Sequence, residues 1–258
     1  MDHLEHNRDA WNRESSAGGE WSIPVSAQTI AAAKGGNWSV ILTPLKLVPR
    51  EWFGDLKGKR VLCLASAGGQ QAPILAAAGA KVVSFDLSDE QLARDAEVAA
   101  RDQLDLQCVR GDMADLSQFP DDSFDLIFHA VSNVFVPDVE QVWRECYRVL
   151  KPKGALLAGC MNPSFFLFDH DESIRSGRLE VKYALPYAEP ESLDEARKGE
   201  IEKGGRALEF SHSLTSQIGG QTKAGFVIAD LFEDHWTDEL PYNRYSPSYI
   251  ATLAMKPA

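Results

Sequence analysis

The apolar positions of this chain divide it into a regular central part and two less regular flanks. Between residues 58 and 160, short apolar runs alternate with segments whose apolar residues recur at helical spacing. The runs are short and rich in Val, Leu, Ile and Phe, as expected of strands buried on both faces. They predict five strands: Arg60–Leu64, Lys81–Asp86, Leu106–Arg110, Phe124–His129 and 155–160.

Three helices are predicted between these strands, over residues 72–80, 89–101 and 139–150. Ser88 is a typical N-cap, and Asp89 and Glu90 follow it in the first turn, where the helix dipole favours acids. The last helix is expected to stop at the Lys-Pro-Lys-Gly sequence of residues 151–154. Strands that alternate with helices predict a parallel sheet covered on both faces, with right-handed crossovers.

The flanks have weaker patterns. The opening segment predicts an irregular or partly helical extension, and a polar insertion follows Met161. In the insertion, residues 189–203 predict a solvated helix and residues 207–214 alternate like a strand. A glycine-rich helix over 215–223 and an antiparallel hairpin are expected to close one domain, 1–258. Its predicted parts are an extension or cap (1–57), a ligand-binding core (58–160), an insertion that caps the substrate (161–214), and a helix with two strands, 226–232 and Tyr249–Met255 (215–258).

Composition narrows the class of protein. The 258 residues are 44% hydrophobic and 25% charged, as in ordinary globular proteins, and the formal net charge is −12. This charge disfavours nucleic acid and anionic membranes as partners. The sequence has neither an apolar run of roughly 20 residues nor an apolar leader. The four cysteines stand singly, without the spacing of a metal site. We therefore predict a soluble cytoplasmic protein without a metal and leave its oligomeric state open.

Candidate chemistry lies at the ends of the first two strands. Residues 65–71 (ASAGGQQ) form a turn of small residues, which allows a ligand to approach the backbone closely. Asp86 ends the second strand about twenty residues later, where a carboxylate accepts hydrogen bonds from ribose hydroxyls. A purely structural turn, and an acid that only favours the following helix, are the alternatives. Taken alone, the two features suit an NAD site and an S-adenosylmethionine site equally.

Four motifs resemble those of class I S-adenosylmethionine-dependent methyltransferases of the type 11 group. Residues 60–71 resemble the first motif, although alanines replace two glycines and Cys63 replaces the usual acid. Residues 111–113 (GDM) resemble the adenine site. The run at 119–128 (FPDDSFDLIF) resembles the recurrent "fPd-sFD-v" segment, and 144–154 (RECYRVLKPKG) resembles "E-xx-RVLKPGG". The resemblance covers residues 58–160 by motif and 215–258 only by topology.

This resemblance implies a Rossmann-like, doubly wound α/β fold with seven strands in the order 3-2-1-4-5-7-6, the last antiparallel. It also implies S-adenosyl-L-methionine as cofactor, bound over the carboxyl ends of the strands, and S-adenosyl-L-homocysteine as product. The acid of residues 111–113 would bind the adenine amine, and the neighbouring apolar side chain would pack on the ring. The implied cofactor-binding residues are Ala65, Ser66, Ala67, Gly69, Gln71, Asp86, Leu87, Gly111, Asp112, Met113, His129, Ala130 and Val131.

Methyl transfer requires alignment of the reactants more than a catalytic group, so a catalytic residue need not exist. His129 is the candidate base or cofactor contact, with a locally bonded, packed histidine as the alternative. We expect a small-molecule acceptor that is methylated on O, N or C. Substrate-binding candidates, each of which also suits plain packing, are Trp11, Trp38, Asn133, His212, Tyr242 and Arg244.

Two other classes of function remain open. An NAD(P)-dependent oxidoreductase would share the doubly wound sheet, but it would favour a stricter Gly-x-Gly-x-x-Gly turn than residues 65–71 provide. A non-catalytic domain that binds S-adenosylmethionine, or has a regulatory role, would be compatible with the altered first motif. The retained acids Asp86 and Asp112 favour the enzyme over this second alternative.

Overall fold

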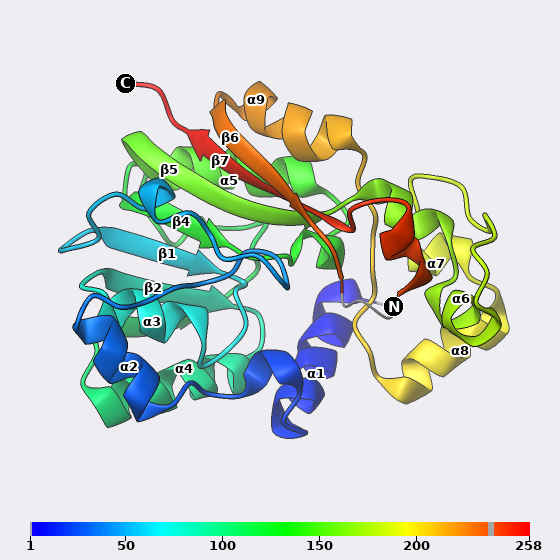
Figure 1. Ribbon diagram of the computed structural model, residues 1–258, viewed down its shortest axis with the longest axis horizontal. Helices are drawn as coiled ribbons and strands as arrows, with labels where there is room; N and C mark the ends of the chain where they lie inside the picture. Colours follow the sequence, from blue (N-terminus) through cyan, green and yellow to red (C-terminus); the bar gives the residue numbers. More distant parts are fainter. Residues whose placement is uncertain (1, 237–239) are drawn as a thin grey trace.

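The computed structural model describes residues 2–236 and 240–258. Within them, seven strands form one sheet in the order β3-β2-β1-β4-β5-β7-β6 (Figure 1). Strands β1 to β5 pair in parallel, whereas β7 is antiparallel to both of its neighbours. The predicted fold and strand order are confirmed. The strands are β1 (Arg60–Leu64), β2 (Lys81–Asp86), β3 (Leu106–Arg110), β4 (Phe124–His129), β5 (Leu150–Met161), β6 (Val227–Asp234) and β7 (Tyr249–Met255).

Helices cover both faces of the sheet and form a separate layer beside it (Figure 1). The α-helices are α1 (His3–Ser16), α2 (Ala27–Lys34), α3 (Gln71–Ala77), α4 (Asp89–Asp102), α5 (Val139–Val149), α6 (His170–Ser176), α7 (Glu189–Ser192), α8 (Glu195–Gly204) and α9 (Gly220–Ala224). Short 3-10 turns cover Glu20–Ser22, Arg50–Trp52, Asn133–Phe135, Pro163–Leu167 and Pro241–Arg244, and Thr215–Gly219 is a π turn. The helix predicted over 215–223 is thus present as a π turn followed by α9.

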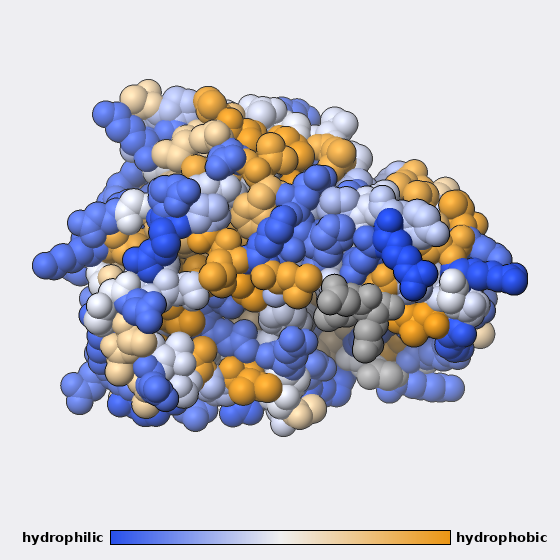
Figure 2. Space-filling model, in the orientation of Figure 1, coloured by the Kyte–Doolittle hydropathy of each residue, from blue (hydrophilic) through white to orange (hydrophobic). Residues whose placement is uncertain are grey.

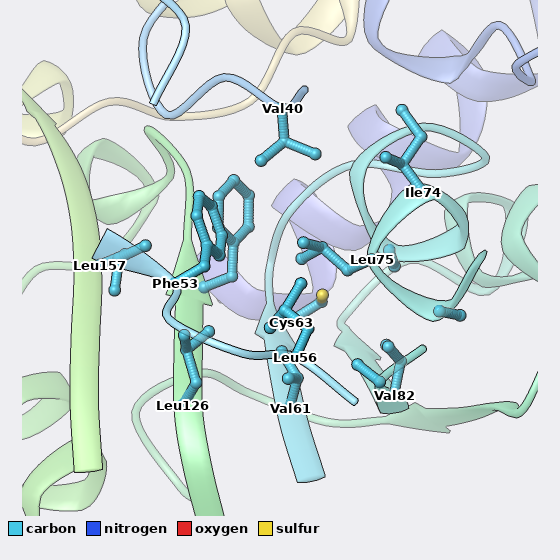
Figure 3. Packing of buried hydrophobic residues seen from close by; sticks show 14 of the residues in the cluster. Val40, Phe53, Leu56, Val61, Cys63, Ile74, Leu75, Val82, Leu126 and Leu157 are labelled. Atoms are coloured by element: carbon cyan, nitrogen blue, oxygen red, sulfur yellow. The ribbon is translucent and has the colours of Figure 1, made fainter. Parts of the chain in front are cut away.

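Alternating residues of each strand face two different cores. Val61 and Cys63 of β1 pack with α2, α3 and the segment around Phe53, whereas Leu62 and Leu64 pack with α5. The strands are therefore apolar on both faces, which explains their unbroken hydrophobic runs. Figure 3 shows Cys63 among apolar side chains that include Leu75. Burial raises the pKa of the Cys63 thiol, so this side chain stays neutral where the family motif has an acid.

The predicted end of the helix before residues 151–154 is confirmed, whereas the predicted start of the fifth strand at residue 155 is wrong. Helix α5 ends at Val149, and β5 begins at once with Leu150, so residues 151–154 lie within the strand. The glycine and proline are accommodated by an irregularity in the pairing with β4, between Phe124 and Leu126, and by a positive φ of 67° at Lys153. A β-bulge tolerates the residues that would otherwise end a regular element.

The strand predicted at residues 207–214 does not form. The segment makes only an isolated bridge, between Phe210 and Ala188. Its backbone N–H groups instead bond to scattered partners: Leu208 to the Asn7 side chain at 2.7 Å and Phe210 to the Val134 carbonyl at 2.7 Å. The alternation in the sequence reflects packing into a third small core, to which Leu208 belongs, and not pairing in a sheet.

Helix α1 lies between the sheet and the layer formed by α6, α7 and α8 (Figure 1). On one side, the amide oxygen of Asn12 accepts hydrogen bonds from the Ser88 hydroxyl and from the backbone of Glu90. On the other side, Asn7 bonds to both the N–H and the C=O of Leu208. Helix α1 therefore joins the start of α4 to the insertion. The boundaries of these parts remain predictions.

The surface fits the acidic composition. Figure 2 shows one face on which hydrophilic side chains predominate and apolar ones form separate patches. In the described ranges 2–236 and 240–258, no helix is both long and apolar enough to cross a membrane.

Candidate functional site

A cavity of about 1030 Å³ opens where the parallel strands end. Its floor comes from the segments that follow β1, β2, β3 and β4, and its far wall comes from the insertion and from α1. Ligands of open α/β sheets bind at this edge, beyond the carboxyl ends of the strands. Of the predicted cofactor-binding residues, those that line the cavity are Ala65, Ser66, Ala67, Gln71, Asp86, Leu87, Gly111, Asp112, Met113, Ala130 and Val131.

The turn after β1 has an unusual backbone for its sequence. Ala65 and Ala67 have φ values of 45° and 64°, in the left-handed region that normally favours glycine. Between Ala67 and Gly69, a side chain on Gly68 would come within 2.3 Å of the carbonyl oxygen of Gln91 in α4. The turn thus presses closely on α4 and keeps small side chains toward the cavity. The two alanines retain the shape of the family's glycine turn with some conformational strain.

Replacing Ala67 by glycine is expected to stabilise the protein by about 1 kcal/mol. An L-residue in the left-handed region costs about 1–2 kcal/mol, which glycine relieves. Part of this gain is offset because glycine makes the unfolded chain more flexible. Thermal unfolding should show a rise of about 2–4 °C. The matched control is Ala31→Gly on the exposed side of α2, where glycine should lower stability by about 1 kcal/mol. Equal losses in both variants would contradict the assigned strain.

Contacts of Gly69 and Asp95 fix the turn after β1 to neighbouring segments of the protein. Gly69 does not line the cavity, because it packs against Pro24: a Cβ atom added to Gly69 would lie 2.9 Å from the Cα of Pro24. The prediction that Gly69 contacts the cofactor is therefore corrected. Its N–H donates to Asp95 Oδ1 at 2.6 Å, and the other oxygen of Asp95 accepts from Ser84 Oγ at 2.5 Å. Burial raises the pKa of Asp95 to about 7. A buried acid from α4 thus orders the turn.

Asp86 presents a carboxylate to the cavity at the end of β2. Its Oδ1 accepts the backbone N–H of Ser88 at 2.9 Å, and within residues 2–236 and 240–258 it forms no ion pair with a basic side chain. Burial raises the pKa of Asp86 to about 6. An unpaired, half-buried carboxylate at this position is suited to accept hydrogen bonds from ligand hydroxyls. The N-cap role belongs to Ser88, whose hydroxyl accepts from Gln91 N.

The segment after β3 forms the next part of the floor. A side chain on Gly111 would come within 2.2 Å of the Phe85 ring, so glycine is required for this segment to lie against β2. Asp112 closes a local turn by accepting the Ala114 N–H at 2.9 Å and also faces the cavity. Met113 lies beside it, half-buried against the core. The predicted acid and its apolar neighbour therefore face the same space as Asp86.

His129 lies behind the cavity wall and does not line it. The side chain is fully buried, with Nδ1 2.8 Å from the Leu64 carbonyl oxygen and Nε2 2.5 Å from the side-chain amide of Asn133. Burial lowers the pKa of His129, whereas the oxygen atoms beside its two ring nitrogens favour the protonated ring. The interpretation of His129 as a base or cofactor contact is corrected to that of a packed, locally bonded histidine. The adjacent Ala130 and Val131 do line the cavity.

Of the substrate-binding candidates, only Trp11 lines the cavity, where it packs edge-on against Phe135. Asn133 and His212 are both buried, and His212 Nε2 lies 3.0 Å from the Asn133 carbonyl oxygen. His212 is therefore neither exposed nor in a strand. The remaining three also lie outside the cavity: Trp38 packs on Phe53 and Arg50, Tyr242 is buried against Phe165 and Ser164, and Arg244 is exposed.

The insertion supplies about half of the cavity residues that the sequence did not single out. They include five Phe and Tyr side chains and two ion pairs, Arg197 with Asp169 and Arg206 with Glu189. Glu189 is thus buried, contrary to the solvated helix face predicted for residues 189–203. The only signal was the density of aromatic residues after Met161. The aromatic lining consists of Trp11, Trp21, Phe85, Phe135, Phe165, Phe166, Phe168, Tyr183, Tyr187, Trp236 and Tyr249.

The two most recognisable motifs have structural roles. Asp125 accepts the Arg60 N–H at 2.8 Å and pairs with Lys151 at 2.8 Å, which ties the starts of β1 and β4 to β5. Arg148 pairs with Glu145 and Asp121 and donates to the carbonyls of residues 116 and 119. These contacts lie at the end of the sheet away from the cavity. They explain why these motifs identify the fold although they do not identify the residues of the cavity.

The strand order and the position of the cavity define a class I S-adenosylmethionine-dependent methyltransferase fold. Residues 62–158 match the family model described as a methyltransferase domain. The chain is 48% identical over 253 residues to the Bacillus subtilis protein named uncharacterized methyltransferase YbaJ, with 98% of each chain covered. The chain therefore belongs to the S-adenosylmethionine-dependent methyltransferase family and is an enzyme of that class.

Solved structures share the fold at low sequence identity. A methyltransferase from Mesorhizobium loti aligns with a TM-score of 0.63 and 22% identity, covering 80% of this chain and 95% of that one. The [4+2]-cyclase SpnF aligns with a TM-score of 0.60 and 17% identity, covering 99% and 95%. These likenesses concern the fold alone.

The residues of the cavity fit the cofactor that this family implies, S-adenosylmethionine. Asp86 has an unpaired carboxylate, and the amide oxygen of Gln91 is buried at the cavity wall with no hydrogen-bond donor among the described residues. Both are acceptors, and the cofactor carries donors in its ribose hydroxyls, adenine amine and ammonium group. Within residues 2–236 and 240–258, no group of three or more His, Cys, Asp or Glu is arranged to hold a metal ion.

Proposed function

We propose that this enzyme transfers a methyl group from S-adenosylmethionine to a small, largely apolar acceptor held in the same cavity. The observation that carries the proposal is the continuity of the cavity. One space is bounded by the predicted cofactor residues at the strand ends and by aromatic side chains of the insertion. A volume of about 1030 Å³ exceeds what the cofactor alone requires and leaves room for an acceptor.

Three parts of the floor are assigned to the cofactor in this proposal. Asp86 binds the ribose hydroxyls, Asp112 binds the adenine amine with Met113 beside the ring, and the turn from Ala65 to Ala67 lies along the methionine portion. When bound, the cofactor supplies an electrophilic methyl group on a sulfonium. The protein aligns the acceptor with that group and excludes water, which by itself supplies roughly 7–11 kcal/mol of the barrier reduction.

Two further features support the proposal. Tight packing of α1 over the cavity, through Trp11 and Phe135, suits a compact acceptor better than a macromolecule. The four cysteines are unpaired, as in a reducing compartment, which is consistent with a role in the cytoplasm.

The alternatives use the same fold for other purposes. A [4+2]-cyclase has this fold, so the fold does not determine the reaction. A regulatory domain that only binds the cofactor would have no use for the enclosed aromatic wall beyond the floor. An NAD(P)-dependent oxidoreductase is disfavoured by membership of the methyltransferase family.

Isothermal titration of the purified protein with S-adenosylhomocysteine tests the proposal, with NAD as a parallel ligand. We expect micromolar affinity for S-adenosylhomocysteine and no saturable binding of NAD. Failure of S-adenosylhomocysteine to bind would overturn the proposed function. Saturable binding of NAD alone would favour the oxidoreductase.

A further inference from the structure

The far end of the cavity holds two polar groups that the proposed cofactor site does not use. Glu209 lies in the extended segment after α8, and Tyr249 is the first residue of β7. Both line the cavity, on the side of the insertion. The phenol ring of Tyr249 is only 1% exposed, and its hydroxyl has no hydrogen-bond partner among the described residues. A buried hydroxyl without a partner is costly and therefore indicates a ligand.

The carboxylate of Glu209 is available to accept hydrogen bonds because the neighbouring Arg206 pairs mainly with another acid. Arg206 lies 3.8 Å from Glu209 but makes its short, direct ion pair with the buried Glu189. The side chain of Glu209 is 34% exposed and lines the cavity. Burial, followed by the charge of Glu189, raises the pKa of Glu209 to about 7. Glu209 can thus lose and regain a proton near neutral pH.

Tyr249 complements Glu209 as a donor. Burial and the negative charges of Glu209 and Asp234 raise the pKa of Tyr249, so its hydroxyl stays protonated. Both side chains line the same cavity, and they do not bond to each other. Their combination of one free acceptor and one free donor matches a hydroxyl, which donates one hydrogen bond and accepts another. An ammonium group would satisfy Glu209 and leave Tyr249 without an acceptor.

The walls around this pair are aromatic. Trp236 stacks on Tyr249 with ring centroids 5.4 Å apart, and Phe166 stacks on Tyr187 at 5.6 Å. Leu240 and Leu193 add aliphatic surface. Flat apolar walls with a few polar groups at one point are typical of a site for an aromatic molecule whose single polar substituent sets its orientation.

The geometry points to Glu209 and Tyr249 as the site that binds the hydroxyl of an aromatic methyl acceptor, with Glu209 as the group that takes its proton. This inference rests on the proposed function. The acceptor oxygen forms its bond to the methyl carbon while the bond between that carbon and the sulfonium sulfur breaks. The electron pair of the broken bond remains on sulfur, the hydroxyl proton passes to Glu209, and the Tyr249 hydroxyl donates to the acceptor oxygen throughout.

The test compares two probes that differ only at the recognised group, 4-chlorophenol and 4-chlorotoluene, in which a methyl group replaces the hydroxyl. Dissociation constants are measured near neutral pH, where 4-chlorophenol keeps its proton, with saturating S-adenosylhomocysteine. We expect the wild type to bind 4-chlorophenol at least about tenfold more tightly than 4-chlorotoluene. Glu209→Gln and Tyr249→Phe should each reduce this preference to less than about threefold. Glu200→Gln, which makes the same change at a more exposed residue of the cavity rim, should retain it.

Affinity for S-adenosylhomocysteine is measured on the same samples and shows that each variant is folded. A wild type that binds S-adenosylhomocysteine but does not distinguish the probes would overturn the inference and leave the proposed function intact. A preference that survives in both Glu209→Gln and Tyr249→Phe would also overturn it. Loss of S-adenosylhomocysteine binding by the wild type would instead reject the proposed function.

Discussion

Replacing Asp86 by alanine is expected to weaken the binding of S-adenosylhomocysteine by at least about 100-fold. An ionised carboxylate that accepts two ribose hydroxyls makes two charge-assisted hydrogen bonds, each worth about 1.5–3 kcal/mol. Asp86 forms no ion pair within the described ranges, so nothing nearby replaces it when it is removed. Isothermal titration of the variant and the wild type measures the difference directly.

The same interaction predicts a pH dependence. Burial raises the pKa of Asp86 to about 6, and the ribose hydroxyls bond best to its ionised form. Affinity for S-adenosylhomocysteine should therefore be constant above pH 7 and fall about tenfold for each pH unit below 6. Asp86→Asn should be weak at all these pH values and lose the dependence.

Asp89→Ala provides the matched control. Asp89 lies three residues further on, in the exposed first turn of α4, and does not line the cavity. Its removal should change affinity less than about twofold. If Asp86→Ala binds S-adenosylhomocysteine as well as the wild type does, Asp86 is not the ribose ligand and the cofactor must lie elsewhere in the cavity.

Replacing Asp95 by alanine is expected to lower the free energy of unfolding by about 3 kcal/mol relative to Asp95→Asn, which keeps a neutral side chain of the same shape. The change leaves the Gly69 N–H and the Ser84 hydroxyl without their acceptor, and each unsatisfied buried group costs about 1–3 kcal/mol. The midpoint of thermal unfolding should fall by about 6–12 °C. Because the Gly69 contact orders the turn after β1, affinity for S-adenosylhomocysteine should fall as well, by about tenfold.

Asp95→Asn separates the hydrogen bonds from the charge. The amide keeps an acceptor for Gly69 and a donor for Ser84, so little change from the wild type is expected below pH 4, where Asp95 is protonated in both the folded and the unfolded state. Burial raises the pKa of Asp95 to about 7 from its ordinary value of 3.8. The folded state thus holds a proton that the unfolded state releases, and stability from this group is present below pH 4 and lost as pH rises through 7.

Asp95→Asn should therefore be more stable than the wild type at pH 8, by up to about 4 kcal/mol, and the advantage should shrink toward pH 5. Denaturant unfolding at pH 5, 6, 7 and 8 measures this. A constant difference across the four pH values would show that Asp95 is not the group whose ionisation is suppressed by burial.

Local patterns in the sequence determined the sheet. Five strands begin and end where the apolar runs predicted, because a buried strand requires an apolar run that is visible in the sequence itself. Asp86 and Asp112 could also be placed, since residues that directly follow parallel strands must meet at one edge of the sheet. The family motifs added the strand order, which periodicity alone does not determine.

Tertiary structure decided which residues face the ligand. His129 and Gly69 stand in the predicted segments but turn into the protein, His129 toward Leu64 and Asn133 and Gly69 toward Pro24 and Asp95. The direction of a side chain at the end of a strand depends on partners that are distant in the sequence. No local pattern reports these partners, so the sequence placed the segments correctly and some of their residues wrongly.

The acceptor side of the cavity depended entirely on the tertiary structure. Glu209 and Tyr249 are forty residues apart and line one cavity because β7 runs antiparallel to β5 and the insertion supplies part of the cavity wall. The segment around Glu209 is extended like a strand, yet its backbone bonds to side chains and loops, such as Asn7 of α1. By itself the sequence determined the class of enzyme and predicted where its cofactor binds. Which polar groups line the proposed acceptor site was decided by packing between residues that are distant in the sequence, and such packing leaves no periodic pattern in the sequence.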